Sequence, residues 1–152
     1  MYADSSLKSV TAKQGLATGD NDRFVRLFWE SEPSAKKWLP LAKGGEATPF
    51  YGDVPTEINW ARNGEEIKQD ICFKYPYLKG NYSFVVKNED AYYRPCLTWT
   101  LRANSLSLRV FPQDGIFDRG GSCVFVAQDD PEKLLATLAV LNLSLIHISE
   151  PT

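Results

Sequence analysis

The chain has 152 residues, of which 43% are hydrophobic and 12% are aromatic, so it is large and apolar enough to bury the core of one domain. Its 17 basic and 19 acidic residues give a net charge of −2. This balance argues against a free-standing, nonspecific DNA-binding protein with a strongly basic surface, but it allows a local basic patch within a larger protein.

The cysteines and the signals for cellular location exclude several classes of protein. Cys72, Cys96 and Cys123 are widely spaced and form no Cys-x-x-Cys pair, so we expect buried free thiols and no metal site. The first residues lack the basic segment and apolar core of a signal peptide, and no stretch is long enough to span a bilayer. We therefore expect a cytoplasmic protein without membrane contact.

The segment Gly15–Arg26 is the first distinctive part of the chain. Its two glycines permit a positive φ or a close approach by another backbone, and residues 20–22 can close Asx turns or cap a short helix. Arg23 and Arg26 are one helical turn apart, so both guanidinium groups would emerge on one side of a helix and could reach a phosphate or a base edge. The same composition is also typical of an ordinary turn.

Short elements are predicted after this segment. A helical turn at Asp22–Arg26 precedes a strand at Leu27–Trp29, and a further extended segment at Trp38–Leu41 ends at the turn Lys43–Gly45. Because proline cannot donate a hydrogen bond to a neighbouring strand, Pro40 places its strand at a sheet edge.

The middle of the chain continues this pattern. Alternating residues at Thr56–Trp60 predict a strand, and the turn signal Asn63-Gly64 leads into one or two helical turns at Glu65–Gln69. Tyr82–Val86 is predicted as a strand or an extended loop.

The clearest sheet lies in the last third of the chain. Leu97–Leu101 and Ser105–Phe111 alternate with period two and are close in sequence, which predicts an antiparallel pair. Two further segments, Gly115–Asp118 and Ser122–Val126, flank a turn at Gly120-Gly121.

A helix follows these strands. Asp129-Asp130-Pro131-Glu132 supplies an N-cap, a first-turn proline and an acid at the positive helix end, so a helix is predicted over Lys133–Leu141. Its apolar face packs on the sheet and consists of Leu134, Leu135, Leu138 and Leu141. The fold class is therefore α+β, with mostly antiparallel β segments and short helices in a partial domain of a larger protein.

Ten motifs, spread in order from about Lys13 to about Leu141, carry a resemblance to a known family. They are Gly15–Arg26, Trp29-Glu30, Lys36–Pro40, Lys43–Glu46, Tyr51-Gly52, Asn59-Trp60, Asn63–Ile67, Leu97–Thr100, Arg109–Pro112 and Gly115–Ser122. In this order they resemble the C-terminal, target-recognition part of the PglX-like adenine-specific DNA methyltransferases of BREX phage-exclusion systems. Related fused restriction-modification enzymes are similar as well.

The resemblance implies a parent enzyme that transfers a methyl group from S-adenosylmethionine to adenine N6 in double-stranded DNA. The glycine-containing cofactor loop and the Asn-Pro-Pro-Tyr motif of the family do not occur in this sequence. In the family both lie upstream of the matched part. We therefore expect a fragment that contributes target recognition, binds no cofactor itself and is inactive without the missing catalytic domain.

The two ends of the chain are expected to differ from its middle. The segment Leu143–Thr152 resembles the translation of a transposase adapter used for sequencing libraries, and it contains the single histidine, His147. The predicted organisation is an N-terminal tail at residues 1–12, an incomplete target-recognition-like region at 13–142 and a non-native tail at 143–152.

The resemblance places DNA contacts in three sets of residues, because such regions read bases while the catalytic domain extracts the adenine. In the second set, two glycines behind a lysine let a backbone come close to an anion. The first set is Thr18, Asp20, Asn21, Arg23 and Arg26; the second is Lys43, Gly44 and Gly45; the third is Trp99, Arg102, Arg109, Asp118 and Arg119.

Other roles remain open for these residues and for the whole region. Asp118 can be structural and pair with an arginine, and the tryptophans Trp38, Trp60 and Trp99 can belong to the core rather than stack on bases. The region itself can be a docking module for other phage-defence proteins or for a phage inhibitor, or a structural spacer.

Overall fold

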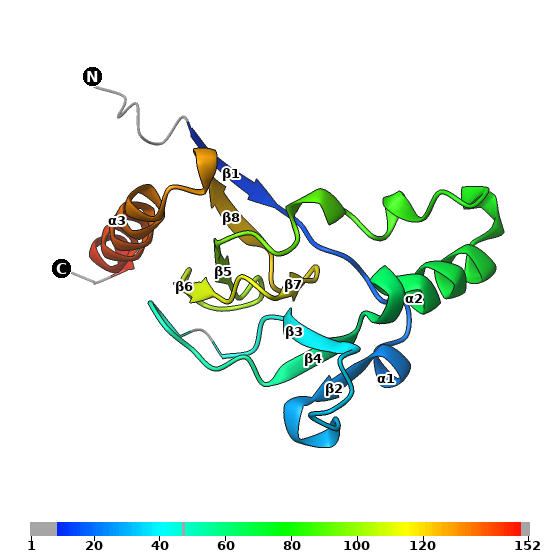
Figure 1. The fold of residues 1–152 in the computed structure, drawn as a ribbon. Helices are drawn as coiled ribbons and strands as arrows, with labels where there is room; N and C mark the ends of the chain where they lie inside the picture. Colours follow the sequence, from blue (N-terminus) through cyan, green and yellow to red (C-terminus); the bar gives the residue numbers. More distant parts are fainter. Residues whose placement is uncertain (1–8, 47, 150–152) are drawn as a thin grey trace.

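The computed structural model describes residues 9–46 and 48–149, and eight strands in this part form two four-stranded sheets (Figure 1). The first sheet is antiparallel throughout, because each of its strands pairs with a neighbour of opposite direction. Its order is β1 (Val10–Lys13), β8 (Cys123–Val126), β5 (Cys96–Trp99) and β6 (Leu108–Phe111).

The second sheet is smaller and mixed. Its strands β2, β4 and β3 are antiparallel neighbours, whereas β7 runs parallel to β3 through the pairs Leu41–Ile116 and Ala42–Phe117. Its order is β2 (Val25–Leu27), β4 (Thr56–Asn59), β3 (Trp38–Ala42) and β7 (Ile116–Phe117). The predicted α+β class with mostly antiparallel strands is confirmed.

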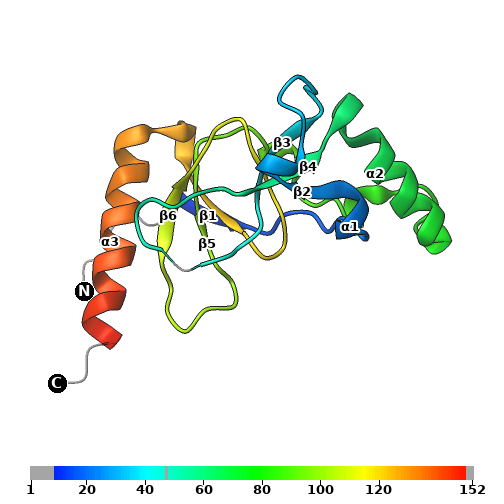
Figure 2. The same ribbon diagram turned by 90° about the horizontal axis from the view of Figure 1, so that it is seen from below.

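Helices lie at both ends of this arrangement, with the sheets between them (Figure 2). The α-helices are α1 (Asn21–Phe24), α2 (Ala61–Lys74) and α3 (Pro131–Ser149), and short 3₁₀ turns occur at Phe28–Glu30, Pro76–Leu78, Tyr82–Phe84, Glu89–Ala91 and Ala127–Asp129. No helix among the described residues is both long and apolar enough to cross a membrane.

Two hydrophobic clusters hold these elements together. The larger cluster joins α2 to both sheets, and Phe117 of β7 lies at its centre in ring contact with Tyr92 and Phe125. The smaller cluster joins α3 to the first sheet through Leu134 and Leu138. The first sheet is therefore packed by both clusters, and the second sheet by the larger cluster.

The predicted helix at Glu65–Gln69 is correctly placed but too short. Arg62, Asn63 and Gly64 have left-handed backbone angles, so the regular helix begins after the predicted Asn63-Gly64 turn. The helix continues to Lys74 because Ile67 and Ile71, one turn apart, are both fully buried in the larger cluster.

Two strand predictions need correction. The strand predicted at Leu27–Trp29 ends at Leu27, and the two aromatic residues form a 3₁₀ turn. The segment Tyr82–Val86 forms no strand, because the N–H groups of Val85 and Val86 both donate to the carbonyl of Tyr82.

The prediction that Pro40 marks an edge strand is also wrong, because β3 lies between β4 and β7. Pro40 is opposite Glu57 of β4, and pairing with β7 starts one residue later, at Leu41. The proline is tolerated because β7 does not extend to its side of the strand.

Strand β1 and helix α3 overlap the two tails that were predicted at the chain ends. Strand β1 begins at Val10, inside the predicted tail at residues 1–12, and α3 extends from Pro131 to Ser149, across the predicted boundary at residue 143. Residues 1–8 and 150–152 lie outside the described residues. The adapter-like origin of the last ten residues stays a prediction.

Candidate nucleic-acid interface

The first predicted set of residues forms a loop that is braced by its own side chains. The Oδ1 atom of Asp20 accepts a hydrogen bond of 3.2 Å from the backbone N–H of Arg23, which confirms the predicted cap of a short helix. Thr18 is only 4% exposed, and its hydroxyl donates to Oδ1 of Asn21 over 2.6 Å. Thr18 therefore shapes the loop from inside, and a direct contact with DNA would require the loop to open.

Arg23 and Arg26 do not share the predicted helical turn, because α1 ends at Phe24 and Arg26 lies on β2. The guanidinium of Arg23 bonds Asp70 of α2 at 3.2 Å, and its side chain remains 54% exposed. That of Arg26 donates to the carbonyls of Asp22 and Val25 and lies over the ring of Trp38. The helical spacing of Arg23 and Arg26 was therefore wrongly predicted, but both side chains still reach the surface.

The second predicted set begins at the end of β3. Gly44 and Gly45 have φ of +93° and +88°, so the chain turns there with a backbone conformation that favours glycine. Lys43 Nζ lies 3.1 Å from Oδ2 of Asp118, a buried residue that also accepts hydrogen bonds from the N–H groups of Gly120 and Gly121. Asp118 thus has the structural role considered above, with a lysine rather than an arginine as its partner.

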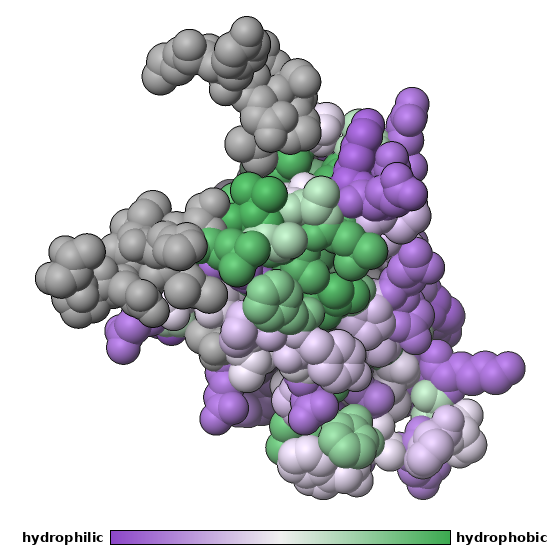
Figure 3. Space-filling view, turned by 90° about the vertical axis from the view of Figure 1, so that its left-hand side faces the viewer, coloured by the Kyte–Doolittle hydropathy of each residue, from purple (hydrophilic) through white to green (hydrophobic). Residues whose placement is uncertain are grey.

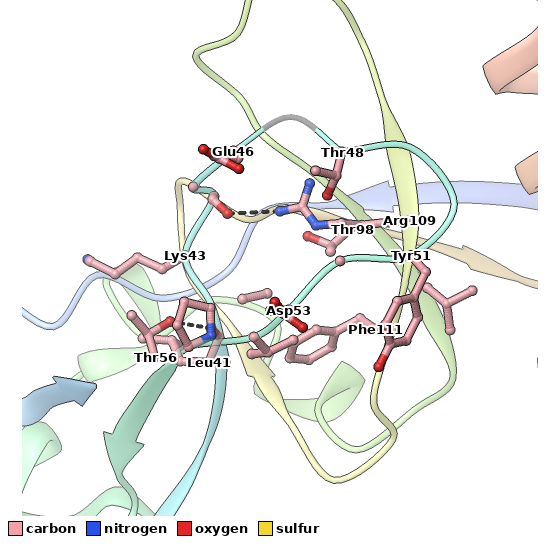
Figure 4. A pocket seen from close by; sticks show the side chains of 17 residues that line it. Leu41, Lys43, Glu46, Thr48, Tyr51, Asp53, Thr56, Thr98, Arg109 and Phe111 are labelled. Atoms are coloured by element: carbon pink, nitrogen blue, oxygen red, sulfur yellow. Dashed lines mark hydrogen bonds between the residues drawn. The ribbon is translucent and has the colours of Figure 1, made fainter. Parts of the chain in front are cut away.

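A pocket of about 760 Å³ lies beside this turn, between β3 of the second sheet and β6 of the first (Figure 4). The long segment from Leu41 to Thr56 forms most of its wall, and Thr98 and the β6 residues Arg109–Phe111 form the rest. The pocket therefore brings together two parts of the chain that are far apart in sequence.

Arg109 connects the third predicted set to this pocket. It is 6% exposed, and its guanidinium donates to the carbonyl of Gly44 over 2.8 Å and to Oγ1 of Thr100 over 3.2 Å. Among the residues that the structure describes, no carboxylate lies within 4 Å of it. Burial lowers the pKa of the Arg109 guanidinium, because the charged form loses solvation.

A second hollow, of about 400 Å³, joins the first set to the second. Asn21 and Arg26 line it on one side and Lys43 and Thr56 on the other, and the last two residues also line the larger pocket. The two sets are therefore neighbours on one surface. Acidic side chains are interspersed here, since Asp22 and Glu30 line the same hollow.

The remaining members of the third set lie apart from one another. Arg102 is exposed in the loop between β5 and β6, and Arg119 is exposed in the turn before β8. Trp99 is half-buried and packs against the smaller hydrophobic cluster, while Trp60 is buried in the larger one. For these two tryptophans the structure supports the core role.

An exposed aromatic pair in this region was not predicted. Phe28 and Trp29 are 57% and 63% exposed, and their rings meet edge to face with centroids 5.0 Å apart. The strand predicted at Leu27–Trp29 would have turned one of the two rings toward the core, whereas the 3₁₀ turn leaves both exposed. The exposed lysines Lys36 and Lys37 follow in the same connection, between β2 and β3.

Known proteins that are similar to this chain are named adenine-specific methyltransferases. The chain is similar to the adenine-specific methyltransferase BrxX of Escherichia coli O9:H4 (strain HS), with 32% identity over 148 aligned residues that cover 91% of the chain. It is also similar to the adenine-specific methyltransferase PglX of Lacticaseibacillus casei (strain Zhang), with 29% identity over an alignment of 171 positions that covers 99% of the chain. No family model matches.

The chain spans only a small part of these relatives, 11% of BrxX and 14% of PglX. The predicted similarity to adenine-specific methyltransferases is therefore confirmed, and it concerns one segment of them.

Proposed function

We propose that this chain is a piece of a site-specific DNA adenine-N6 methyltransferase and that it contributes contacts to double-stranded DNA. The observation that carries the proposal is the similarity over 91% and 99% of the chain to two adenine-specific methyltransferases. The sequence has no Asn-Pro-Pro-Tyr motif, so methyl transfer and S-adenosylmethionine binding belong to the missing catalytic domain of such an enzyme. The parent acts in a phage-defence system in the cytoplasm.

The proposed DNA-facing surface is the one that joins the two hollows. It contains the half-exposed cations Arg26 of β2 and Lys43 after β3. The exposed Arg23 follows its lining residue Asp22 in the chain, and the exposed pair Phe28 and Trp29 follows its lining residue Leu27. Cations of this kind can reach phosphates, while exposed rings can contact the edge of a base step. With a net charge of −2, the chain relies on this local patch and on its parent for affinity.

Binding of the purified chain to a short fluorescent duplex, measured by anisotropy at several salt concentrations, tests the proposal. The double variant Arg23→Ala, Arg26→Ala should weaken binding and reduce the slope of log K against log salt by about 1.8, because each lost phosphate contact removes about 0.9. A matched control is Arg62→Ala, Lys79→Ala, since both positions are exposed and lie outside the two hollows. Equal affinity and equal slope in the two double variants would contradict the DNA role of this loop.

A docking module for other phage-defence proteins is the second candidate, and one observation favours it. Figure 3 shows hydrophobic side chains gathered on the face that carries α3, where Leu135, Val140 and Leu143 are 60%, 48% and 54% exposed. Exposed apolar surface of this kind marks protein contacts more often than DNA contacts. A Leu135→Lys, Val140→Lys variant that keeps DNA binding but loses binding to the other proteins of the system would support this role.

A further inference from the structure

The pocket between β3 and β6 has features that a flat DNA-backbone contact does not need. Its volume of about 760 Å³ falls within the range of about 300 to 1,000 Å³ typical of small-ligand sites. It is also divided chemically: Arg109 lies at one end with the glycine turn, Thr48 and Glu46, and apolar side chains lie at the other end (Figure 4).

The cationic end is built around Arg109. Arg109 is 6% exposed as a residue, and within the described part of the chain its guanidinium bonds only the neutral oxygens of Gly44 and Thr100. A guanidinium has more N–H donors than these two bonds use, and a buried charge without a counter-charge is unfavourable. An anionic group that entered the pocket would supply the missing counter-charge, and the Gly44-Gly45 backbone lies at the same end. Lys43 also lines the pocket, but its Nζ is paired with Asp118.

The opposite end suits a flat apolar group. Leu41, Val54 and Phe111 line it, and Tyr51, which is 78% exposed, stands at the rim (Figure 4). The carboxylate of Asp53 lies between these residues and can accept hydrogen bonds from an amino group. A small bare anion would gain nothing from this end and would be repelled by Asp53.

We propose that this pocket binds one nucleotide. Its phosphate lies at Arg109 and the Gly44-Gly45 turn, its base lies against Tyr51 and Phe111, and Asp53 accepts a hydrogen bond from an exocyclic amino group. The nucleotide has two sources with the same chemistry, a free mononucleotide or one unstacked nucleotide of a DNA strand. Only the second source rests on the proposed function.

The experiment is a titration of the ¹⁵N-labelled chain, followed by NMR, with dAMP, dCMP, dGMP, dTMP and inorganic phosphate as separate ligands. Saturable shifts at Gly44, Gly45 and Asp53 are expected with nucleotides that carry an amino group, and weaker binding with dTMP and with phosphate. Tyr51→Ala should weaken nucleotide binding about tenfold through lost stacking. Arg109→Gln should abolish it, whereas Arg62→Gln, at an exposed position outside this pocket, should not change it.

Asp53→Asn provides a second variant at an exposed position, in case Arg109→Gln fails to fold. It should reduce the preference for amino-bearing bases and leave phosphate binding equal or stronger. Absence of shifts with every nucleotide, equal affinity for phosphate and nucleotides, or unchanged nucleotide affinity in both Tyr51→Ala and Asp53→Asn would each overturn the proposal.

Titration with a DNA single strand and with a duplex separates the two sources and the two proposals. Shifts at Tyr51 and Asp53 with strands assign the nucleotide to DNA, and shifts with mononucleotides alone assign it to a free ligand; both support the pocket. Nucleotide binding without any duplex binding would remove the proposed function and leave this inference standing. Duplex binding with no nucleotide-induced shift in the pocket would overturn this inference and support the proposed function.

Discussion

Asn142 of α3 holds the outer edge of the first sheet. Its side-chain amide donates to the carbonyl of Leu108 and accepts from the N–H of the same residue, both over 2.8 Å. Leu108 begins β6, the last strand of that sheet, and its carbonyl also accepts from the N–H of Phe50. The buried amide and the backbone of Phe50, which also accepts from the N–H of Val110, together do for this edge what a neighbouring strand would do.

We predict that Asn142→Ala lowers the free energy of unfolding by about 1 to 3 kcal/mol. The reason is that the substitution leaves the buried backbone groups of Leu108 without this partner. Urea unfolding measures the change, with Asn104→Ala as the matched control, because Asn104 is exposed in the loop before β6. A loss no larger than that of the control would show that water replaces the amide at no cost.

Tyr92 makes the free energy of unfolding depend on pH in the alkaline range. It is 4% exposed, packs edge to face against Trp60 and Phe117, and its burial raises the pKa of the phenol well above the ordinary value of 10.0. The folded state therefore keeps a proton that the unfolded state loses. This contribution is fully present below pH 10.0 and is lost as the pH rises above it toward the raised pKa of the folded state.

The prediction is that wild-type stability falls more steeply than that of Tyr92→Phe above pH 10.0. The difference should be about 1.4 kcal/mol for each pH unit, which is the free energy of one proton. Urea unfolding at pH 9 and pH 11 measures both slopes, and Cys123, whose pKa is also raised by burial, contributes equally to the two proteins. Parallel pH curves would mean that Tyr92 ionises freely in the folded state.

At the scale of elements, α3 packs on the first sheet with only part of its apolar surface. Leu134 and Leu138 are 8% and 6% exposed and belong to the smaller cluster. Leu135, which was predicted to pack with them, is 60% exposed, because it lies about 100° around the helix from Leu134. Apolar spacing alone cannot select among three or four neighbouring leucines.

The two faces of α3 should therefore respond differently to truncation. Leu138→Ala should cost about 2 to 5 kcal/mol of unfolding free energy, because it opens a cavity in the smaller cluster. Leu135→Ala removes the same atoms from an exposed position and should stay within about 0.5 kcal/mol of wild type. Equal losses from the two variants, measured by thermal or urea unfolding, would place α3 in a different orientation on the sheet.

Local signals predicted most elements, but they did not predict how strands combine. The antiparallel pair of β5 and β6 followed from alternation and closeness in sequence, and Asp130-Pro131 correctly marked the start of α3. By contrast, β7 and β8 flank the Gly120-Gly121 turn but belong to different sheets. No local sequence signal indicates this division, because β7 pairs with β3, and β8 pairs with β1 and β5. These partners lie far away in sequence.

At the scale of the whole molecule, the candidate site is a product of topology. The sequence identified Lys43, Gly44, Gly45 and Arg109 separately, as members of two sets. The contact that joins them, from the Arg109 guanidinium to the carbonyl of Gly44, spans 65 residues and exists because β3 and β6 border one pocket. The residue types suggest an affinity for anions, but the pocket itself forms only where the fold brings β3 and β6 together.

A segment exchange tests the recognition role in a complete enzyme. In Escherichia coli BrxX, the residues aligned with this chain would be replaced by residues 9–142, so that Asn142 is kept, and methylated adenines would be located by sequencing. If this region selects the target, the methylated sequence should change, because base contacts specify sites while catalytic groups only require an adenine. Chimaeras carrying Arg23→Ala, Arg26→Ala should methylate less than chimaeras carrying the control pair Arg62→Ala, Lys79→Ala. An active chimaera that still methylates the original sequence of BrxX would show that recognition depends on another part of the enzyme, and the exposed faces of this chain would then be better explained by protein contacts.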